Sequence, residues 1–286
     1  MKKLEEQSVK VDIIVTSPPY NINKGYRSYL DNKEKEEYLK WLYQVAKESF
    51  TILKDDGSFF LNIGGIPSEP FLPFEAAERF SQAGYQLQNT IHWIKSISFE
   101  KEDVGKTNGF HNDFSIGHFK PITSERFLTD THEYIFHFTK TGDVKLDKLS
   151  VGVPYQDKTN IGRWKSAIQD RRDRGNTWFI PYPTITEGRP HPAVFPEKLP
   201  YLCVKLHGVR EGMIVYDPFM GIGTTALACL LFPNINYLGT EIDDQYIKIA
   251  RNNIDERKGM LQKNEGRITK IVDWLDEDDV LLGSTG

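Results

Sequence analysis

The chain has 286 residues, with 36 lysines and arginines against 40 aspartates and glutamates, and 39% of its residues are hydrophobic. This balance is that of a folded protein with a large core, and it excludes a disordered or fibrous chain. No stretch reaches the roughly 20 apolar residues of a membrane-spanning helix, and the first residues lack the apolar run of a secretory signal, so we expect a cytoplasmic protein. Two cysteines are too few for a disulfide framework.

The net charge of −4 conceals an uneven distribution. Residues 265–286 contain six acidic and two basic residues, so this tail carries the whole net charge and the rest of the chain is neutral. Residues 158–174 contain six basic and two acidic residues. Because a nucleic acid is bound by a basic surface rather than by a basic total, this local patch leaves an anionic partner open.

The first part of the chain alternates expected strands and helices. In order, we expect a strand at Val11–Thr16, an amphipathic helix at 32–53, a strand at 58–63, a helix around 74–83 and a strand around 88–94. Such alternation predicts an α/β fold, in which a mostly parallel twisted sheet carries helices on both faces.

The pattern changes from about residue 95 to about residue 190. Gly, Asn and His are scattered there, and only 133–138 reads as a clear strand, so we expect an insertion over the sheet. Periodicity then returns. In order, we expect a helix at 196–207, a strand at 213–217, a helix at 224–231, a strand at 237–242 and a helix at 245–253.

The strongest local motif is DPFMGIGTTALA at residues 217–228. Its glycines let the backbone approach a ligand, and the following helix start offers free N–H groups. Glu241 stands twenty residues beyond Gly221, at the end of the next expected strand, where a carboxylate can accept hydrogen bonds from ribose hydroxyls. The motif departs from GxGxxG. It predicts a site for an adenosine-type cofactor, and the alternative is a tight turn beside an acid exposed by chance.

A second motif, TSPPY, occupies Thr16–Tyr20 at the mouth of the first expected strand. Two consecutive prolines fix the backbone, direct the Ser17 hydroxyl and the Pro18 carbonyl into the site, and present Tyr20 as a stacking surface. A planar base that carries an amino group would fit between them. The alternative is a rigid turn with a surface aromatic residue.

Four segments occur in an order that resembles a known family: TSPPY, HEYIFHF, HPAVFPEKLP, and DPFMGIGTT followed by GTEID. The family is the S-adenosylmethionine-dependent DNA amino-methyltransferases in the permuted (beta-type) order. The resemblance implies a Rossmann-like methyltransferase fold. It also implies a catalytic half at 1–95, a variable region at 96–190 with the strand at 133–138 and a target-recognition insertion around 140–190, a cofactor-binding half at 191–264 and an acidic tail at 265–286.

TSPPY together with HPAVFP is similar to the branch that methylates N4 of cytosine, whereas the N6-adenine branch more often has Asp where Ser17 stands. The resemblance therefore implies methylation of cytosine N4 in double-stranded DNA after base flipping, within a restriction-modification system and beside a cognate restriction endonuclease. We expect a monomer or a homodimer. The alternatives are an N6-adenine DNA methyltransferase, an RNA or protein amide methyltransferase, and a non-catalytic DNA-binding module.

The resemblance also assigns roles to individual residues. The catalytic candidates are Ser17, Pro18, Pro19 and Tyr20. The cofactor-binding candidates are Ala193, Phe195, Asp217, Phe219, Gly221, Gly223, Thr224, Glu241 and Ile242. Serine is too weak a base to deprotonate an amine, so we expect proton loss to follow methyl transfer.

The basic segment gives the candidates for DNA binding, which could contact phosphates or guanine edges. They are Lys158, Arg163, Lys165, Arg171, Arg172 and Arg174. The alternative is a solvated loop with Arg–Asp pairs. No metal site is expected, because His132 and His137 are five residues apart on an expected strand and their rings should face opposite sides.

The sequence departs from the family pattern at its start. A short strand with a Gly-Asp pair usually precedes the catalytic strand, whereas only ten residues precede Val11 here. MKKLEEQS is similar to the helix that follows that strand. We expect a truncated or alternative start, or replacement of the strand by residues 268–273.

Overall fold

The structure, a computed structural model, describes residues 1–104, 111–117, 122–163, 169–182 and 193–263. Its main sheet has seven strands, which are β1 (Val11–Thr16), β2 (Leu53–Ile63), β3 (Gln86–Ile94), β6 (His132–Thr139), β7 (Thr177–Phe179), β8 (Ile214–Asp217) and β9 (Asn236–Gly239). Across the sheet their order is β7–β3–β6–β2–β1–β8–β9. These seven strands run in one direction except β6, which is antiparallel to β2 and β3.

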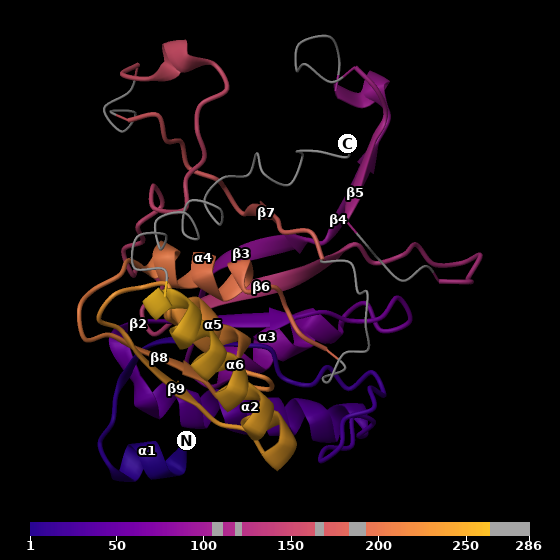
Figure 1. Ribbon diagram of the computed structural model, residues 1–286. Helices are drawn as coiled ribbons and strands as arrows, with labels where there is room; N and C mark the ends of the chain where they lie inside the picture. The colour runs from indigo at the N-terminus through magenta and orange to yellow at the C-terminus, as the bar shows by residue number, and fades with distance from the viewer. Residues whose placement is uncertain (105–110, 118–121, 164–168, 183–192, 264–286) are drawn as a thin grey trace.

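Helices cover both faces of this sheet (Figure 1). They are α1 (Lys2–Glu6), α2 (Lys35–Ile52), α3 (Leu72–Gln82), α4 (Lys198–His207), α5 (Thr224–Cys229) and α6 (Asp244–Lys263). Because successive strand residues point to opposite faces, Ile13 and Val15 pack in one core with α4 and α5, whereas Ile14 packs with α2 and α3. The predicted α/β arrangement is confirmed. Within the described ranges, no helix has both the length and the apolarity to cross a membrane.

Strand β2 begins at Leu53 rather than at 58, and strand β9 differs from its expected extent at its carboxyl end. Strand β9 ends at Gly239 rather than at 242, so Glu241 and Ile242 lie in the loop that follows. There the Thr240 carbonyl accepts a hydrogen bond from the Met220 amide (3.0 Å). The backbone after Gly239 therefore pairs with the turn after β8 and does not lengthen the strand. Helix α6 also continues beyond its expected end.

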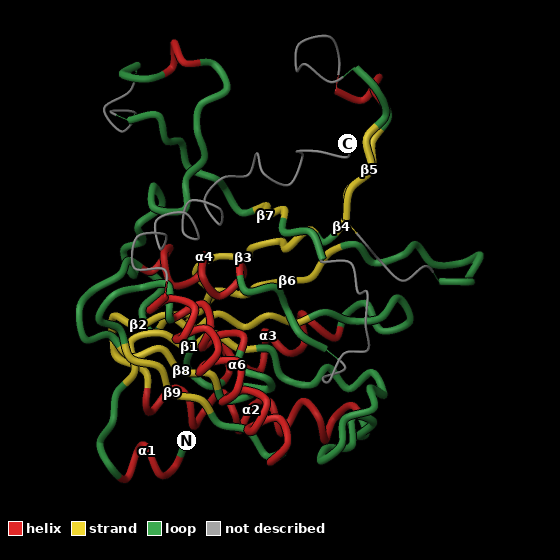
Figure 2. Tube along the Cα trace, viewed as in Figure 1, coloured by secondary structure: helices red, strands yellow, loops and turns green. Residues whose placement is uncertain are grey.

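Two excursions leave the sheet within the 96–190 stretch (Figure 2). One is a two-stranded hairpin of β4 (Ser96–Phe99) and β5 (Phe114–Gly117). The other is the long connection from β6 to β7, which contains the short 3-10 turn η2 (Lys158–Asn160). Strands β4, β5 and β7 were not predicted. They are no longer than β8 and β9, but they lie in the stretch where scattered Gly, Asn and His leave no periodic apolar pattern.

The division of the chain at residues 95, 190 and 264 stays a prediction. The acidic tail expected at 265–286 and the strand considered at 268–273 lie outside the described residues.

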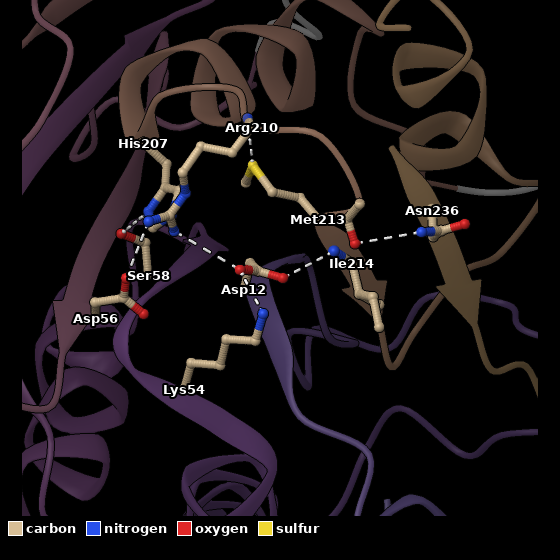
Figure 3. A network of polar contacts seen from close by, with 10 residues as sticks. Asp12, Lys54, Asp56, Ser58, His207, Arg210, Met213, Ile214 and Asn236 are labelled. Carbon is tan, nitrogen blue, oxygen red and sulfur yellow. Dashed lines mark hydrogen bonds and ion pairs between the residues drawn. The ribbon is translucent and has the colours of Figure 1, made fainter. Parts of the chain in front are cut away.

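A polar network joins the amino-terminal ends of three parallel strands (Figure 3). Asp12, near the start of β1, accepts a hydrogen bond from the Ile214 amide of β8 (2.9 Å) and lies 2.8 Å from the Lys54 ammonium of β2. The Arg210 guanidinium lies 3.7 Å from Asp12 and 3.0 Å from Asp56. The network fixes the relative positions of these strands at the edge away from the carboxyl ends.

Two buried histidines extend this network. His207 contacts Arg210, and Ser58 joins His207 to His137. The Ser58 hydroxyl lies 2.9 Å from His137 Nε2 and 2.9 Å from His207 Nδ1. The other ring nitrogens face Asn89 (3.0 Å) and Arg210 (3.3 Å). Burial disfavours the charged imidazolium, and it lowers the pKa of His137 to about 3 and that of His207 to about 4. Both rings are therefore neutral at physiological pH.

Candidate active site

A cavity of about 870 Å³ opens at the carboxyl ends of β1, β2 and β8, the edge at which α/β sheets commonly bind ligands. The loop after β1, the turn after β8 and residues 193–195 form parts of its wall. Its lining is rich in aromatic side chains, which include Tyr20, Tyr26, Trp41, Trp93, Tyr182 and Phe219. The two motifs singled out in the sequence therefore open into one cavity.

Two hydrogen bonds fix the position of the TSPPY loop, which lines the cavity. The Pro19 carbonyl accepts a hydrogen bond from the Tyr38 hydroxyl of α2 (2.7 Å). The Thr16 hydroxyl, at the end of β1, donates to Asp217 (2.7 Å). Ser17, Pro18, Pro19 and Tyr20 all line the cavity, as an active-site loop requires.

Five polar side chains meet beside this loop, and we call them the serine cluster. Ser17 Oγ lies 2.7 Å from Tyr20 Oη, and Tyr20 donates to Glu133 Oε2 (2.9 Å). Asn62 Nδ2 lies 2.7 Å from Tyr20 Oη and 2.9 Å from Glu133 Oε2. Lys95 Nζ lies 3.1 Å from Glu133 Oε1. The cluster couples the Ser17 hydroxyl to a half-buried ion pair.

Three members of the serine cluster were missed by the sequence analysis. Asn62 precedes the last residue of β2, Lys95 follows the last residue of β3, and Glu133 is the second residue of β6. Each therefore stands at a strand end. Because β6 runs antiparallel, its first residues reach the edge where β2 and β3 end. Their position at strand ends is a sequence signal that could have identified these polar residues as candidates. Their meeting at one site depends on the strand order, which could not be predicted from the sequence.

Tyr20 turns its hydroxyl into the serine cluster. Burial, and then the neighbouring Glu133 carboxylate, raise the pKa of Tyr20 well above its ordinary value, so the phenol keeps its proton. Gly64 permits this approach, because a Cβ there would lie 2.9 Å from Glu133 Cγ and 3.3 Å from Tyr20 Cε2. The stacking role expected for Tyr20 stays a prediction.

The loop that follows TSPPY docks on the start of α6. Asp31 is buried and accepts hydrogen bonds from backbone amides of the loop, including that of Lys24 (3.0 Å). Ser28 Oγ donates to Asp243 (2.8 Å), and the Arg27 guanidinium lies 3.5 Å from the same carboxylate. This loop, which the sequence analysis did not single out, joins the TSPPY side of the cavity to the glycine-turn side.

Asp217 lies beneath the glycine turn. Its carboxylate accepts hydrogen bonds from Thr16 Oγ1 (2.7 Å), Thr225 Oγ1 (2.7 Å) and the Phe219 amide (3.0 Å). Burial raises its pKa to about 6 despite these donors. Asp217 is absent from the cavity lining, and its contacts tie β1 to α5.

Glu241 holds the glycine turn from the next loop. Its Oε2 accepts a hydrogen bond from the Gly221 amide (2.9 Å), and its Oε1 accepts one from the Ile242 amide (2.9 Å). Gly223 has φ +87°, and a Cβ there would lie 3.1 Å from Ala250 Cβ, so this glycine permits close packing against α6. Gly223, like Asp217, does not line the cavity. The cofactor candidates that line it are Ala193, Phe195, Phe219, Gly221, Thr224, Glu241 and Ile242.

Residues 11–252 match the family of DNA methylases that includes the N6 and N4 methyltransferases. The chain belongs to this family. It is 30% identical to the Type II methyltransferase M.BglII of Bacillus subtilis over 84% of its own length, and it spans 62% of the length of that relative. It is 31% identical to the orphan methyltransferase M.BamHII of Bacillus amyloliquefaciens, over 90% of its length and 93% of the relative.

Solved structures share the fold of this DNA methylase. The PvuII DNA methyltransferase, described as cytosine-N4-specific, aligns with a TM-score of 0.58 at 21% identity, over 93% of this chain and 86% of that chain. A Thermus thermophilus protein, TTHA0409, described as a DNA modification methylase and solved with S-adenosyl-L-methionine, aligns with a TM-score of 0.54 at 22% identity, over 88% and 90%. The Rossmann-like methyltransferase fold is thereby confirmed.

Two arginines of the basic segment in this DNA methylase hold the local backbone. Arg171 Nη1 donates to the Gly152 carbonyl (2.8 Å), and Arg174 Nε donates to the Val151 carbonyl (2.8 Å). Both side chains are half-buried. They support the connection between β6 and β7, so replacing either would disturb more than the surface charge.

The other described cations of the basic segment are exposed. Lys158 forms an ion pair with Asp170 (2.5 Å), and Arg163 donates to Asn160 (3.3 Å). Arg172 is exposed, and its backbone pairs with Val153. Lys165 lies outside the described residues. A role of this segment in DNA binding stays a prediction.

Among the residues that the structure describes, no group of three or more His, Cys, Asp or Glu side chains is arranged to hold a metal ion.

Proposed function

We propose that this DNA methylase transfers a methyl group from S-adenosyl-L-methionine to the exocyclic N4 of cytosine in double-stranded DNA, after base flipping. The observation that carries the proposal is the cavity, which has the Ser17 hydroxyl on one wall and the glycine turn with Glu241 on another. A methyl donor and an amine acceptor must share one enclosed space for direct transfer, and a volume of about 870 Å³ suits the two together. Membership of the family supports the reaction class.

The residues around the glycine turn fit the cofactor. A carboxylate offers about four lone-pair sites, so Glu241 keeps acceptor capacity for ribose hydroxyls beyond its bonds to backbone amides. The rings of Trp41 and Phe219, with centroids 5.4 Å apart, provide aromatic faces for a planar base. S-adenosyl-L-methionine would supply an activated methyl group there. Ala193 and Phe195 line the same cavity and would close it from the segment before α4.

The TSPPY loop would orient the amine. An exocyclic amine is a poor nucleophile because its lone pair is delocalised into the ring, so its hydrogens must be held while the nitrogen becomes pyramidal. Ser17 Oγ and the Pro18 carbonyl can each accept one of these hydrogens. This catalysis depends on positioning and electrostatics, with no covalent intermediate on the protein.

Cytosine N4 is favoured over adenine N6 by Ser17, because the resembling N4 branch carries serine at this position. The decisive measurement is to treat plasmid DNA with the enzyme and S-adenosyl-L-methionine, digest the DNA to nucleosides and identify the product by mass spectrometry, with Ser17→Ala as the matched control. N4-methylcytosine is expected. N6-methyladenine would overturn the assignment of the base, and no methylated nucleoside from a protein that binds the cofactor would overturn the reaction.

We also propose a place for this enzyme in a restriction-modification system, since M.BglII is named as a Type II methyltransferase. Methylation would then protect one sequence from a cognate restriction endonuclease. Plasmid DNA from a host that expresses the enzyme is expected to resist cleavage by restriction enzymes that recognise the methylated sequence. Complete sensitivity of DNA that carries the methylated base would contradict this role.

A further inference from the structure

The hydrogen bonds of the serine cluster run in one direction. A carboxylate only accepts hydrogen bonds, so Tyr20 spends its single proton on Glu133 (2.9 Å). The Tyr20 oxygen must then be the acceptor in its contact with Ser17 (2.7 Å), and Ser17 must donate. Ser17 Oγ otherwise accepts only the long contact from the Asn62 amide (3.4 Å), which leaves a lone pair to accept a hydrogen of a substrate amine.

Asn62 and Lys95 keep this direction fixed. The amide nitrogen of Asn62 lies 2.9 Å from the Glu133 carboxylate, 2.7 Å from Tyr20 Oη and 3.4 Å from Ser17 Oγ. It therefore turns its hydrogens to the cluster and puts no carbonyl oxygen against the carboxylate. The Lys95 ammonium forms an ion pair with the other carboxylate oxygen (3.1 Å). Both carboxylate oxygens thus have a donor.

We propose that Glu133, acting through Tyr20, positions the Ser17 hydroxyl and receives the proton that the amine loses after methylation. This inference rests on the proposed function. The methylated amine is positively charged, and one of its N–H bonds breaks. Its proton moves to Ser17 Oγ while the proton of Ser17 moves to Tyr20 Oη and that of Tyr20 moves to Glu133 Oε2. One N–H and two O–H bonds break, three O–H bonds form, and no electron is gained or lost.

The relay answers a chemical difficulty of the reaction. Serine alone is too weak a base, but two hydrogen bonds connect it to a carboxylate, which is basic enough for a strongly acidic protonated aryl amine. Glu133 lines the cavity with 16% of its side chain exposed, so its proton can pass to solvent when the product leaves.

The test compares Glu133→Gln with Tyr20→Phe and with the double variant. Gln keeps the shape but removes the charge, and Phe keeps the ring but removes the hydroxyl. We expect the single-turnover rate of methyl transfer to fall by about 100-fold in each single variant, with the double variant no slower than either. Glu133→Asp, which returns a carboxylate to the cluster, should restore part of the rate.

Two further measurements separate the relay from a structural role and from the proposed function. Cofactor affinity, measured by calorimetry, should stay within about twofold in both single variants, because neither residue belongs to the glycine turn. A wild-type rate in Glu133→Gln, or additive losses in the double variant, would overturn the relay. If the wild-type enzyme yields no methylated nucleoside, the proposed function fails instead.

Discussion

Strands β2 and β6 carry two polar clusters on one face, one at each end of their ladder. Ser58, His137 and His207 form the buried group described above, which we call the closed cluster. Asn62 and Glu133 belong to the serine cluster. On each strand the two positions are four residues apart, which separates the clusters by about 13 Å. The same pair of strands therefore supports two networks with different chemistry.

The two clusters differ in what they leave unused. Phe60 and Ile135 lie between them, fully buried, and the Phe60 ring stacks on His137 with centroids 4.6 Å apart. In the closed cluster both histidines have partners on both ring nitrogens and have no access to the cavity. In the serine cluster Ser17 lines the cavity and keeps acceptor capacity beyond the 3.4 Å contact with the Asn62 amide. Side chains whose ring nitrogens all have hydrogen-bond partners stabilise the sheet, whereas a hydroxyl with remaining acceptor capacity can bind a ligand.

Acidification should break the closed cluster first. The pKa values of His137 and His207 are lowered to about 3 and about 4, so the unfolded state binds more protons than the folded state below pH 6.5. The free energy of unfolding should fall by an amount on the order of 3 kcal/mol between pH 6.5 and pH 4. Asp217 opposes this trend because its pKa is raised.

Chemical denaturation across this pH range measures the effect. His137→Gln is the matched control, because it removes one titrating ring while Asp217 remains. The slope of stability against pH should be smaller in the variant. Equal slopes in the two proteins would show that the ring does not titrate as its burial implies.

At the serine cluster, Ser17→Ala should lower turnover by about 100-fold, the usual loss for one partner of the transition state. Cofactor binding should persist, because Ser17 belongs to the TSPPY loop and not to the glycine turn. Single-turnover methylation with labelled cofactor, together with calorimetry, checks both statements. Unchanged turnover would remove Ser17 from the mechanism.

A loss of stability without a loss of turnover is expected for Asp12→Ala, in the polar network at the amino-terminal ends of β1, β2 and β8. This change leaves the half-buried Ile214 amide without its acceptor and the Lys54 ammonium without its partner. The free energy of unfolding should fall by about 2 kcal/mol, and the methylation rate of the folded protein should stay within about twofold. A large loss of turnover without a loss of stability would contradict the separation of the two ends.

The smallest effect is expected on DNA binding. Arg172→Ala removes an exposed charge from the segment proposed to bind DNA, and it should lower the slope of log affinity against log salt by about one. Lys10→Ala removes an exposed charge beside the amino-terminal end of β1 and should leave the slope unchanged. Equal slopes for the two variants would move the DNA contact away from the basic segment.

The sequence was informative where a structure is made by neighbouring residues. Strand β1 and the TSPPY loop are continuous in the chain, so their apolar run and their prolines predicted both elements. The glycine turn was recognisable for the same reason. Helix α2 was recognisable because its buried positions Leu39, Leu42 and Ala46 recur at helical spacing.

The sequence was uninformative where partners come from distant elements. Tyr20 and Glu133 are 113 positions apart, and their contact requires β6 to enter the sheet antiparallel between β2 and β3. No local pattern encodes that order. Asp217 was predicted at the cofactor from its place in the motif, but its depth follows from contacts with Thr16 and Thr225, which only the folded chain brings together.

The bond between Thr16 and Asp217 crosses 201 positions of the chain. It lies at the seam between the TSPPY side and the glycine-turn side, and it does not depend on the path by which the chain connects them. The geometry of the cavity is therefore independent of which half is translated first. A gene that encoded the two halves in the reverse order, or on separate polypeptides, would keep the same seam and the same cavity.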